Sequence, residues 1–218
     1  DLRATNPPSN APLLDALADD FRRHDYDLKH LIRTIMSSHV YGLSSSPNDR
    51  NMADLRNFSR HYRRRLRAEE LLDAVCDVTG VPESFDAAPP GTRASALWTV
   101  RTDSLFLDAF GRPDPNQDPP CERTTDTSVV QALHLMNAPK LHDKITRDSG
   151  RAAALSKSDR EPASIIEELY LLAYGRPPSS DELQVAVDFF SQCGDDRRRA
   201  VEDLMWALLN TPEFVFEN

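Results

Sequence analysis

Hydrophobic residues recur at helical spacing in the first forty positions of the chain. Asn10 can cap a helix over residues 11–24, and Asp27 can cap a second one. The apolar stripe of this second helix falls at i, i+3, i+4, i+7 and i+8, and consists of Leu28, Leu31, Ile32, Ile35 and Met36. Because only a short link separates the two segments, we expect an antiparallel helical hairpin.

A polar loop around residues 44–51 and an arginine-rich stretch precede the third predicted helix, residues 68–79. Gly80 and Pro82 end this helix, since glycine accepts a left-handed cap and proline prevents continuation. The residues that this helix is expected to bury are Leu71, Leu72, Val75 and Val78.

The segment over residues 81–126 is rich in proline and irregular, and only residues 104–110 resemble a helix. Irregular segments of this length are uncommon inside compact domains, and are often functional or disordered.

The second half of the chain is again helical. Asp126 or Thr127 can cap a helix that runs to Asn137, and Pro162 can open another that ends at Gly175. Ser179 and Glu182 have the spacing of a capping box, for a helix that runs to about Cys193. Asp195 or Asp196 opens the last helix, whose inward residues are Val201, Leu204, Met205, Leu208 and Leu209.

No useful β-alternation occurs, so the predicted fold class is all-α. We expect a multi-helix orthogonal or bundle-like domain with one long irregular proline-rich segment. A single domain over residues 1–218 is the simplest organisation, and a subdivision into 1–80 and 127–218 around 81–126 is the alternative.

Two short phrases resemble each other: LDAFGRP at residues 107–113 and LLAYGRP at residues 171–177. The glycine in each suits a left-handed helix cap, and the proline blocks further helix. Two similar helix ends explain the likeness without a duplicated domain.

Composition excludes several classes of function. The net charge is -9, which argues against a general nucleic-acid binder because such proteins need a basic face. The apolar stretches are too short to span a membrane. No Cys-x-x-Cys or Cys-x-x-Cys-His spacing occurs, so this segment attaches no c-type haem and holds no cysteine-rich zinc site.

One run of arginines concentrates positive charge between residues 56 and 67, interleaved with aromatic residues. Guanidinium groups bind phosphate, sulfate or acidic polysaccharides bidentately, so this run is a candidate anion site. The alternative, favoured by the acidic total, is a solvated face that pairs with Glu69, Glu70 and Asp73. The candidate anion-binding residues are Arg60, Arg63, Arg64, Arg65 and Arg67.

Cys121, Glu122 and Arg123 lie just before a predicted helix, where a thiol could have a lowered pKa. His134 is too far along that helix to presume contact with the thiol, so we assign no catalytic residue. The alternative is that Glu122 and Arg123 form ion pairs that fix the loop.

The six histidines form no His-x-x-x-His or His-Glu-x-x-His pair, so the sequence indicates no metal site. Nucleophile-elbow, phosphate-loop and dinucleotide-binding motifs are also absent from the sequence. The rigid phrase between Asn6 and Asn10 is either a recognition loop or a helix start, and we favour the helix start.

Several phrases together resemble the planctomycete-specific family called domain of unknown function 1553. They cover residues 5–17 (TNPPSNAPLLDAL), 31–43, 57–72, 106–113, 121–137, 169–183 and 203–216. The resemblance brings no established activity and no catalytic residues. Family members often carry a second cysteine two residues before the Cys-Glu-Arg phrase, where this chain has Pro119.

The resemblance implies a setting outside the cytoplasm, periplasmic or secreted, and a parent protein with further domains. We expect this chain, which opens with Asp1, to be the C-terminal part of that parent. The parent is expected to carry a second domain of unknown function and often a cytochrome c-like domain, so haem c would lie outside this segment. The positions to follow as functional residues or structural ties are Cys121, Glu122, Arg123, Asn137, Asn6 and Asn10.

The function expected from these observations is a non-catalytic interaction or scaffold domain in a cytochrome c-containing or polysaccharide-handling assembly. Its expected partners are the N-terminal domains of its parent, a cytochrome c-like domain or another exported protein, and no nucleic acid. The alternative is an enzyme domain that acts on an anionic glycan through the Cys121 loop and the run from Arg60 to Arg67. A cytochrome-docking surface made of acidic patches is a third hypothesis.

Overall fold

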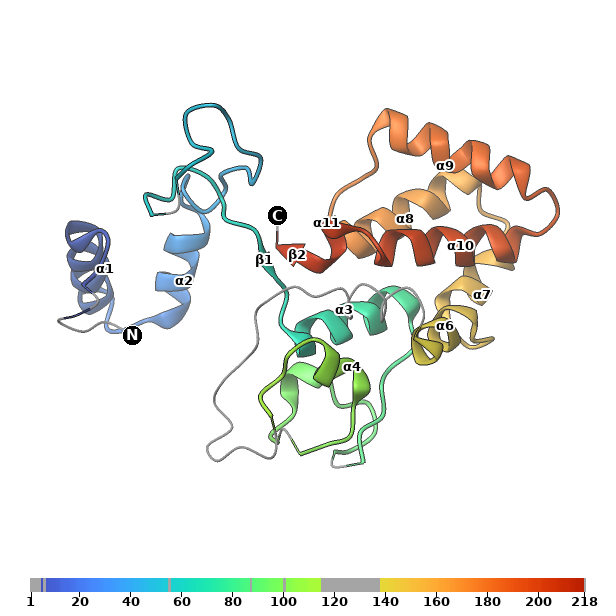
Figure 1. The fold of residues 1–218 in the computed structure, drawn as a ribbon, viewed down its shortest axis with the longest axis horizontal. Coiled ribbons are helices and arrows are strands. Elements are labelled where there is room, and N and C mark those ends of the chain that lie inside the picture. The colour runs from blue at the N-terminus through green and yellow to red at the C-terminus, as the bar shows by residue number, and fades with distance from the viewer. Residues whose placement is uncertain are drawn as a thin grey trace. The chain divides into compact units, whose positions relative to one another are not determined.

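The computed structural model describes residues 5, 7–54, 56–86, 88–99, 101–114 and 138–217. The chain forms two compact units, Asp1–Arg64 and Arg65–Glu217, called unit 1 and unit 2 below (Figure 1). The boundary lies N-terminal to the division after residue 80 that the sequence offered as an alternative.

Unit 1 begins with two helices, α1 (Ala11–Arg23) and α2 (Leu28–Met36), which pack against each other. Both predicted caps are confirmed. The Leu13 amide donates to Asn10 Oδ1 at 3.1 Å. The Lys29 amide donates to Asp27 Oδ1 at 2.8 Å. The side chains of both caps therefore satisfy amides that the first helical turn leaves unpaired.

The link between these helices is a tight turn in which two successive residues are left-handed. Asp25 has φ 51° and Tyr26 has φ 60°, values that side-chain-bearing residues seldom adopt. The ring of Tyr26 meets that of Phe21 edge-on, with centroids 5.4 Å apart. This contact and the Asp27 cap hold the turn in its conformation.

The polar loop that follows α2 is organised by hydrogen bonds. Asn51 Nδ2 donates to the Ser59 carbonyl at 3.3 Å, and the His61 amide donates to the Ser44 carbonyl at 3.1 Å. In the described part of unit 1 the buried residues are polar, Ser45 and Asn51, and no hydrophobic side chain is buried. Polar contacts, rather than a hydrophobic core, therefore give this loop its shape.

Unit 2 is a multi-helix arrangement, and its described part confirms the predicted all-α class. A two-stranded sheet joins β1 (Arg64–Arg65) to β2 (Phe216–Glu217). The helices before the last stretch of the chain are α3 (Ala68–Thr79), the short 3-10 helix η1 (Ala94–Ala96), α4 (Leu105–Ala109), α6 (Pro139–Thr146) and α7 (Arg151–Ser156). The remaining helices are α8 (Pro162–Tyr174), α9 (Ser180–Gln192), α10 (Arg197–Leu209) and α11 (Pro212–Val215).

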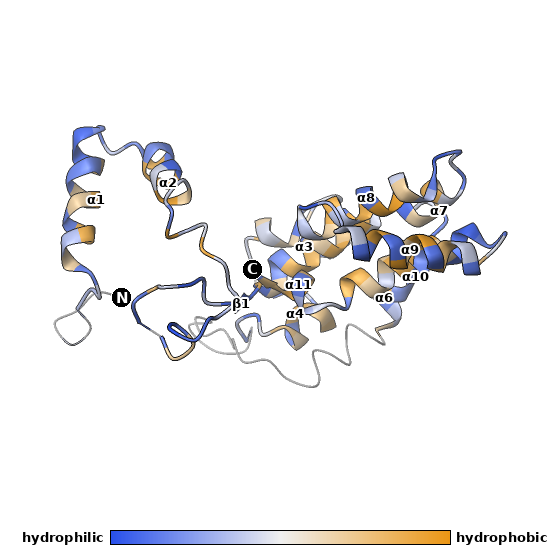
Figure 2. Cartoon of the chain, turned by 90° about the horizontal axis from the view of Figure 1, so that it is seen from above, coloured by the Kyte–Doolittle hydropathy of each residue, from blue (hydrophilic) through white to orange (hydrophobic). Residues whose placement is uncertain are grey.

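The core of unit 2 forms around α10, which packs against α3, α6, α7, α8, α9 and α11. Figure 2 shows the apolar residues of these helices gathered where the helices meet. The burial predicted for α3 and for α10 is confirmed, and α8 adds residues that are 0% exposed, Ile165, Ile166 and Leu169. In the described residues, no helix is long and apolar enough to cross a bilayer.

The predicted helix that runs to Asn137 lies outside the described residues, and the glycine helix ends of unit 2 are confirmed. Gly80, Gly111 and Gly175 adopt φ 70°, 76° and 69°, so each glycine provides the left-handed conformation that ends a helix. The two similar phrases of the sequence are thus two helix ends. Ser179 and Glu182 form the predicted capping box at the start of α9.

Candidate functional site

Most of the loop positions singled out from the sequence lie outside the described residues. They are Cys121, Glu122, Arg123, Asn137 and Asn6, and their roles stay predictions. Asn10 is described, and its side chain caps α1, which agrees with the favoured hypothesis of a helix start.

The candidate anion-binding arginines are divided between the two units. Arg60, Arg63 and Arg64 belong to unit 1, whereas Arg65 and Arg67 belong to unit 2. Arg63 Nε donates to Ser45 Oγ at 3.1 Å, and the Arg60 guanidinium lies 5.2 Å from the centroid of the Tyr62 ring.

Two of the acids expected to pair with this run, Glu70 and Asp73, accept backbone amides. Glu70 accepts the backbone amide of Arg67 at 3.2 Å. Both carboxylate oxygens of Asp73 cap η1, accepting the Ala94 amide at 2.7 Å and the Ser95 amide at 3.0 Å. Asp73 also lies 3.4 Å from Arg93, an arginine outside the run.

A cleft in the described part of unit 2 lies along the C-terminal half of α3 and has a volume of about 300 Å³. Cys76 and Asp77 come from α3, Glu83 and Arg93 come from the following loop, and Arg151 opens α7. Sequence analysis did not predict this cleft, because its walls come from segments far apart in the chain.

A buried lysine, Lys144, contacts two residues that line this cleft, Cys76 and Glu83. Lys144 in α6 is 6% exposed, and its ammonium donates to the carbonyls of Val81 at 3.1 Å and Pro82 at 3.0 Å. Its Nζ lies 3.4 Å from Glu83 and 3.6 Å from Cys76 Sγ. A buried ammonium needs such partners to offset its desolvation, so Lys144 is a structural tie between α6 and the loop after α3.

The remaining charges of the cleft are also paired. Arg93 binds Asp77 through two parallel hydrogen bonds of 3.1 and 2.7 Å. Arg151 donates to the Val78 carbonyl at 3.0 Å and to Glu168 at 3.1 Å. Its guanidinium therefore satisfies a carbonyl at the C-terminal end of α3. These arginines thus fasten neighbouring segments.

Burial raises the pKa of the Cys76 thiol, and this effect outweighs the nearby Lys144 ammonium. A reactive cysteine needs a lowered pKa, because the thiolate is the nucleophile. The cleft therefore holds a thiol that is protonated at neutral pH. Cys76 and Cys193 are both free.

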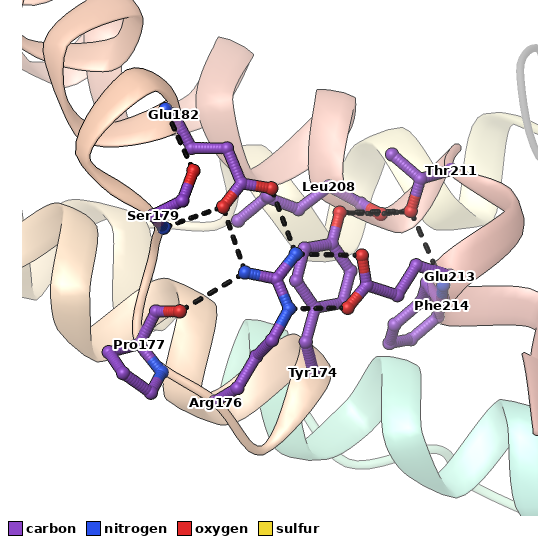
Figure 3. A network of polar contacts seen from close by, with 9 residues as sticks. All are labelled: Tyr174, Arg176, Pro177, Ser179, Glu182, Leu208, Thr211, Glu213 and Phe214. Carbon is purple, nitrogen blue, oxygen red and sulfur yellow. Dashed lines mark hydrogen bonds and ion pairs between the residues drawn. The ribbon is translucent and has the colours of Figure 1, made fainter. Parts of the chain in front are cut away.

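Arg176, in the turn after α8, belongs to the polar network that Figure 3 shows. Its guanidinium donates to both carboxylate oxygens of Glu182, each at 2.8 Å, and to those of Glu213 at 2.7 and 2.8 Å. Nη1 also reaches the Pro177 carbonyl at 3.1 Å, so every N–H of the guanidinium has an acceptor. The network ties the end of α8 to the starts of α9 and α11 and has no donor left for a ligand.

Arg112 occupies the matching position in the other Gly-Arg-Pro turn, but its guanidinium is not fully paired. Nε donates to Asp108 at 2.6 Å, whereas the buried Nη1 has no hydrogen-bond partner among the described residues. The side chain is 4% exposed and lines a second cleft of about 150 Å³, to which Arg67 and Thr99 also contribute.

One group of side chains in the described residues has the composition of a metal site. Asp20, His24 and His30, from α1 and α2, each offer a ligand atom within 4.8 Å of the others. Histidine pairs at the spacing of one helix do not reveal this group. Its sequence signal is an Asp-x-x-x-His pair followed by a histidine beyond the next turn.

Residues 1–190 match a family described as PSD1, protein of unknown function (DUF1553). The chain belongs to this family. The match confirms the resemblance seen in the sequence, although the phrase over residues 203–216 lies beyond the matched range. No curated protein and no solved structure matches the chain.

Proposed function

We propose that this DUF1553 chain is a helical interaction domain that docks on a partner protein through the apolar stripe of α2. The observation that carries the proposal is the exposure of this stripe. Leu28 is 63% exposed, Ile32 53% and Met36 55%. Exposed apolar stripes at helical spacing are typical of helices that pack against another protein surface.

Energetics support the same proposal. A helix of nine residues is marginal in water when it buries nothing, because nucleation is costly and packing supplies most helical stability. Covering the stripe would contribute about 25 cal/mol for each Å² of apolar area removed from water. The hairpin thus gains stability from a partner.

The paired charges of the α3 cleft and the raised pKa of its thiol favour a non-catalytic role for this chain. Its arginines are engaged by carboxylates and carbonyls, the neighbouring Lys144 is bound by carbonyls, and the Cys76 thiol has a raised pKa. Catalytic groups need a pKa matched to their task and a free approach to the substrate. The cleft is better suited to joining α3, α6 and α7 than to chemistry.

The proposed partners are the N-terminal domains of a larger exported parent protein, with a cytochrome c-like domain among them. This part of the proposal rests on the resemblance to planctomycete family members and on the acidic charge of -9, which suits a partner with a basic surface. It places the chain in a periplasmic or secreted scaffold linked to haem or polysaccharide.

The docking proposal is tested by titrating the chain with the separately produced N-terminal part of its parent in a calorimeter. Ile32→Glu should weaken binding at least about tenfold, a loss of about 1.4 kcal/mol. Thr34→Glu adds the same charge to another exposed position of α2 and should leave affinity unchanged. Circular dichroism checks that both variants keep their helices. Equal affinities for the two variants, or no binding by the unaltered chain, would overturn the proposal.

A second candidate function, recognition of an anionic group, has support from Arg112. Its buried Nη1 has no acceptor among the described residues, and leaving a buried donor unpaired costs free energy. An oxygen of a glycan sulfate or carboxylate could accept this hydrogen bond. Titration with inorganic sulfate tests this candidate. Binding that Arg112→Met abolishes would support it, and sulfate affinity unchanged by Arg112→Met would exclude it.

A further inference from the structure

Three side chains converge at the turn between α1 and α2. His30 Nε2 lies 2.8 Å from Asp20 Oδ2, and His24 Nδ1 lies 3.3 Å from Asp20 Oδ1. The two imidazole rings stack with centroids 3.7 Å apart. Asp20 and His24 are one helical turn apart on α1, and the turn through Asp25 and Tyr26 brings His30 beside them.

We propose that Asp20, His24 and His30 form a binding site for a divalent transition-metal ion, with Zn²⁺ as its prototype. This inference is independent of the docking proposed above. Two imidazoles and one carboxylate are ligands that suit Zn²⁺, Ni²⁺ or Cu²⁺, whereas Mg²⁺ and Ca²⁺ prefer oxygen ligands alone.

The separations of the donor atoms fit this coordination. Metal–nitrogen and metal–oxygen bonds of about 2.0–2.2 Å in a tetrahedral site place neighbouring donors about 3.3 Å apart. The distances here are 2.8 Å from His30 Nε2 to Asp20 Oδ2 and 3.3 Å from His24 Nδ1 to Asp20 Oδ1, and both are close to that edge length, although they end on different oxygens of the carboxylate. The ring planes are 20° apart, so one imidazole must rotate for both lone pairs to reach one ion. Both histidines are partly exposed, with side-chain exposures of 47% and 28%, which leaves room for the rotation.

The surroundings define what a bound ion would replace. Without a metal, His24 Nδ1 also contacts the Asp20 carbonyl at 2.9 Å, and Thr34 Oγ1 lies 3.5 Å from His30 Nε2. A bound ion would coordinate the unprotonated nitrogen of each neutral imidazole, and the other ring nitrogen would carry the proton. Three protein ligands leave at least one coordination position for water.

A bound ion would also fasten the hairpin. Asp20 and His24 lie at the end of α1 and His30 lies at the start of α2, so coordination would link the two helices across their left-handed turn. Binding to the folded hairpin alone would raise its stability in proportion to the logarithm of metal concentration over Kd.

The test is a calorimetric titration of the untagged chain with Zn²⁺ at neutral pH. We expect one ion per chain with a Kd in roughly the micromolar range. His24→Ala, His30→Ala and Asp20→Asn should each weaken binding at least about tenfold, an effect of the size that changes around metal sites produce. His39→Ala, at an exposed position outside the cluster, is the matched control and should leave the affinity unchanged.

A second readout separates coordination from weak surface association. The nitrogen chemical shifts of His24 and His30 should change on Zn²⁺ addition while those of His39 and His142 stay constant. Circular dichroism checks that the variants remain helical, and Asp20→Asn keeps the size of the side chain. A Kd weaker than about 1 mM, or an equal loss of affinity in His39→Ala and His24→Ala, would overturn the proposal.

Discussion

The helices of unit 1 and unit 2 have similar amphipathic patterns but different surroundings. α2 carries its apolar stripe on an exposed face and buries no residue, whereas α10 buries Ala200, Val201, Leu204, Met205, Leu208 and Leu209. Periodicity therefore identifies the face of a helix that favours an apolar neighbour, without identifying the neighbour. Within unit 2 that neighbour is the rest of the unit, and for α2 we propose that it is another protein.

The largest expected contrast between the units is in the cost of removing a leucine. Leu169→Ala in α8 should destabilise unit 2 by about 2–5 kcal/mol, because this side chain is 0% exposed and its loss leaves a cavity. Leu28→Ala in α2 should change stability by less than about 0.5 kcal/mol, because the side chain is exposed. Urea unfolding of each variant measures both values, and similar costs at the two positions would erase the contrast.

The two Gly-Arg-Pro turns give a second contrast inside unit 2. Arg176→Met removes a guanidinium whose donors all have acceptors and leaves Glu182 and Glu213 facing each other, so we expect a loss of about 2 kcal/mol. Arg112→Met replaces a buried guanidinium that is only partly paired, and we expect a loss below about 1 kcal/mol. Thermal unfolding of the two variants under one condition compares them, and a larger loss for Arg112→Met would contradict the assignment of Arg176 as the main tie.

Acid should weaken the Arg176 network in a defined range. Hydrogen bonds from Arg176 lower the pKa of Glu182 from 4.5 to about 2. A lowered pKa in the folded state gives stability that is present above pH 4.5 and is lost as the pH falls towards 2. After allowance for solvent screening we expect about 1 kcal/mol from this carboxylate.

Urea unfolding as a function of pH measures this effect, with Glu182→Gln as the matched variant. The stability difference between the unaltered chain and Glu182→Gln should shrink between pH 4.5 and 2. A difference that is constant over this range would show that Glu182 does not titrate with a lowered pKa.

The smallest contrast concerns two glycines. Gly175 ends α8 with φ 69°, so Gly175→Ala should cost about 1 kcal/mol through backbone strain. Gly42 in unit 1 has no positive φ, and the nearest atom to an added Cβ would lie 3.9 Å away, so Gly42→Ala should be close to neutral. Melting temperatures of the two variants test the difference, and equal shifts would indicate that the left-handed cap is not needed.

Local sequence signals predicted much of this fold. Asn10, Asp27, Ser179 and either Asp195 or Asp196 were expected as helix caps, and the side chains of Asn10, Asp27, Ser179 and Asp196 each accept the backbone hydrogen bond that a cap requires. Such caps depend on residues only a few positions away, so a short stretch of sequence contains their signal.

The unpredicted elements depend on contacts between distant segments. The helices α6 and α7 are short, and α7 starts after Gly150 without a side-chain cap. Their formation therefore depends on tertiary packing. Gly150 marks a close approach to the loop after α3, since an added Cβ would lie 3.2 Å from Val81 Cγ2. The contact between Cys76 and Lys144 likewise spans 68 positions, a separation at which sequence spacing carries no signal.

The candidate sites were also only partly predictable from local sequence. The Cys121-Glu122-Arg123 phrase was visible as a motif, but its role stays a prediction because it lies outside the described residues. The cluster of Asp20, His24 and His30 depends on two left-handed residues, Asp25 and Tyr26, which have no reliable sequence signature.

The proposed docking of α2 is tested most directly by hydrogen exchange of the chain alone and within its full-length parent protein. The amides of α1 and α2 should exchange fast in the chain alone and at least about tenfold more slowly in the parent, while α8 and α10 exchange slowly in both. Equal exchange of α1 and α2 in the two proteins would contradict the account, because an exposed apolar stripe that stays uncovered in the parent has no docking function there.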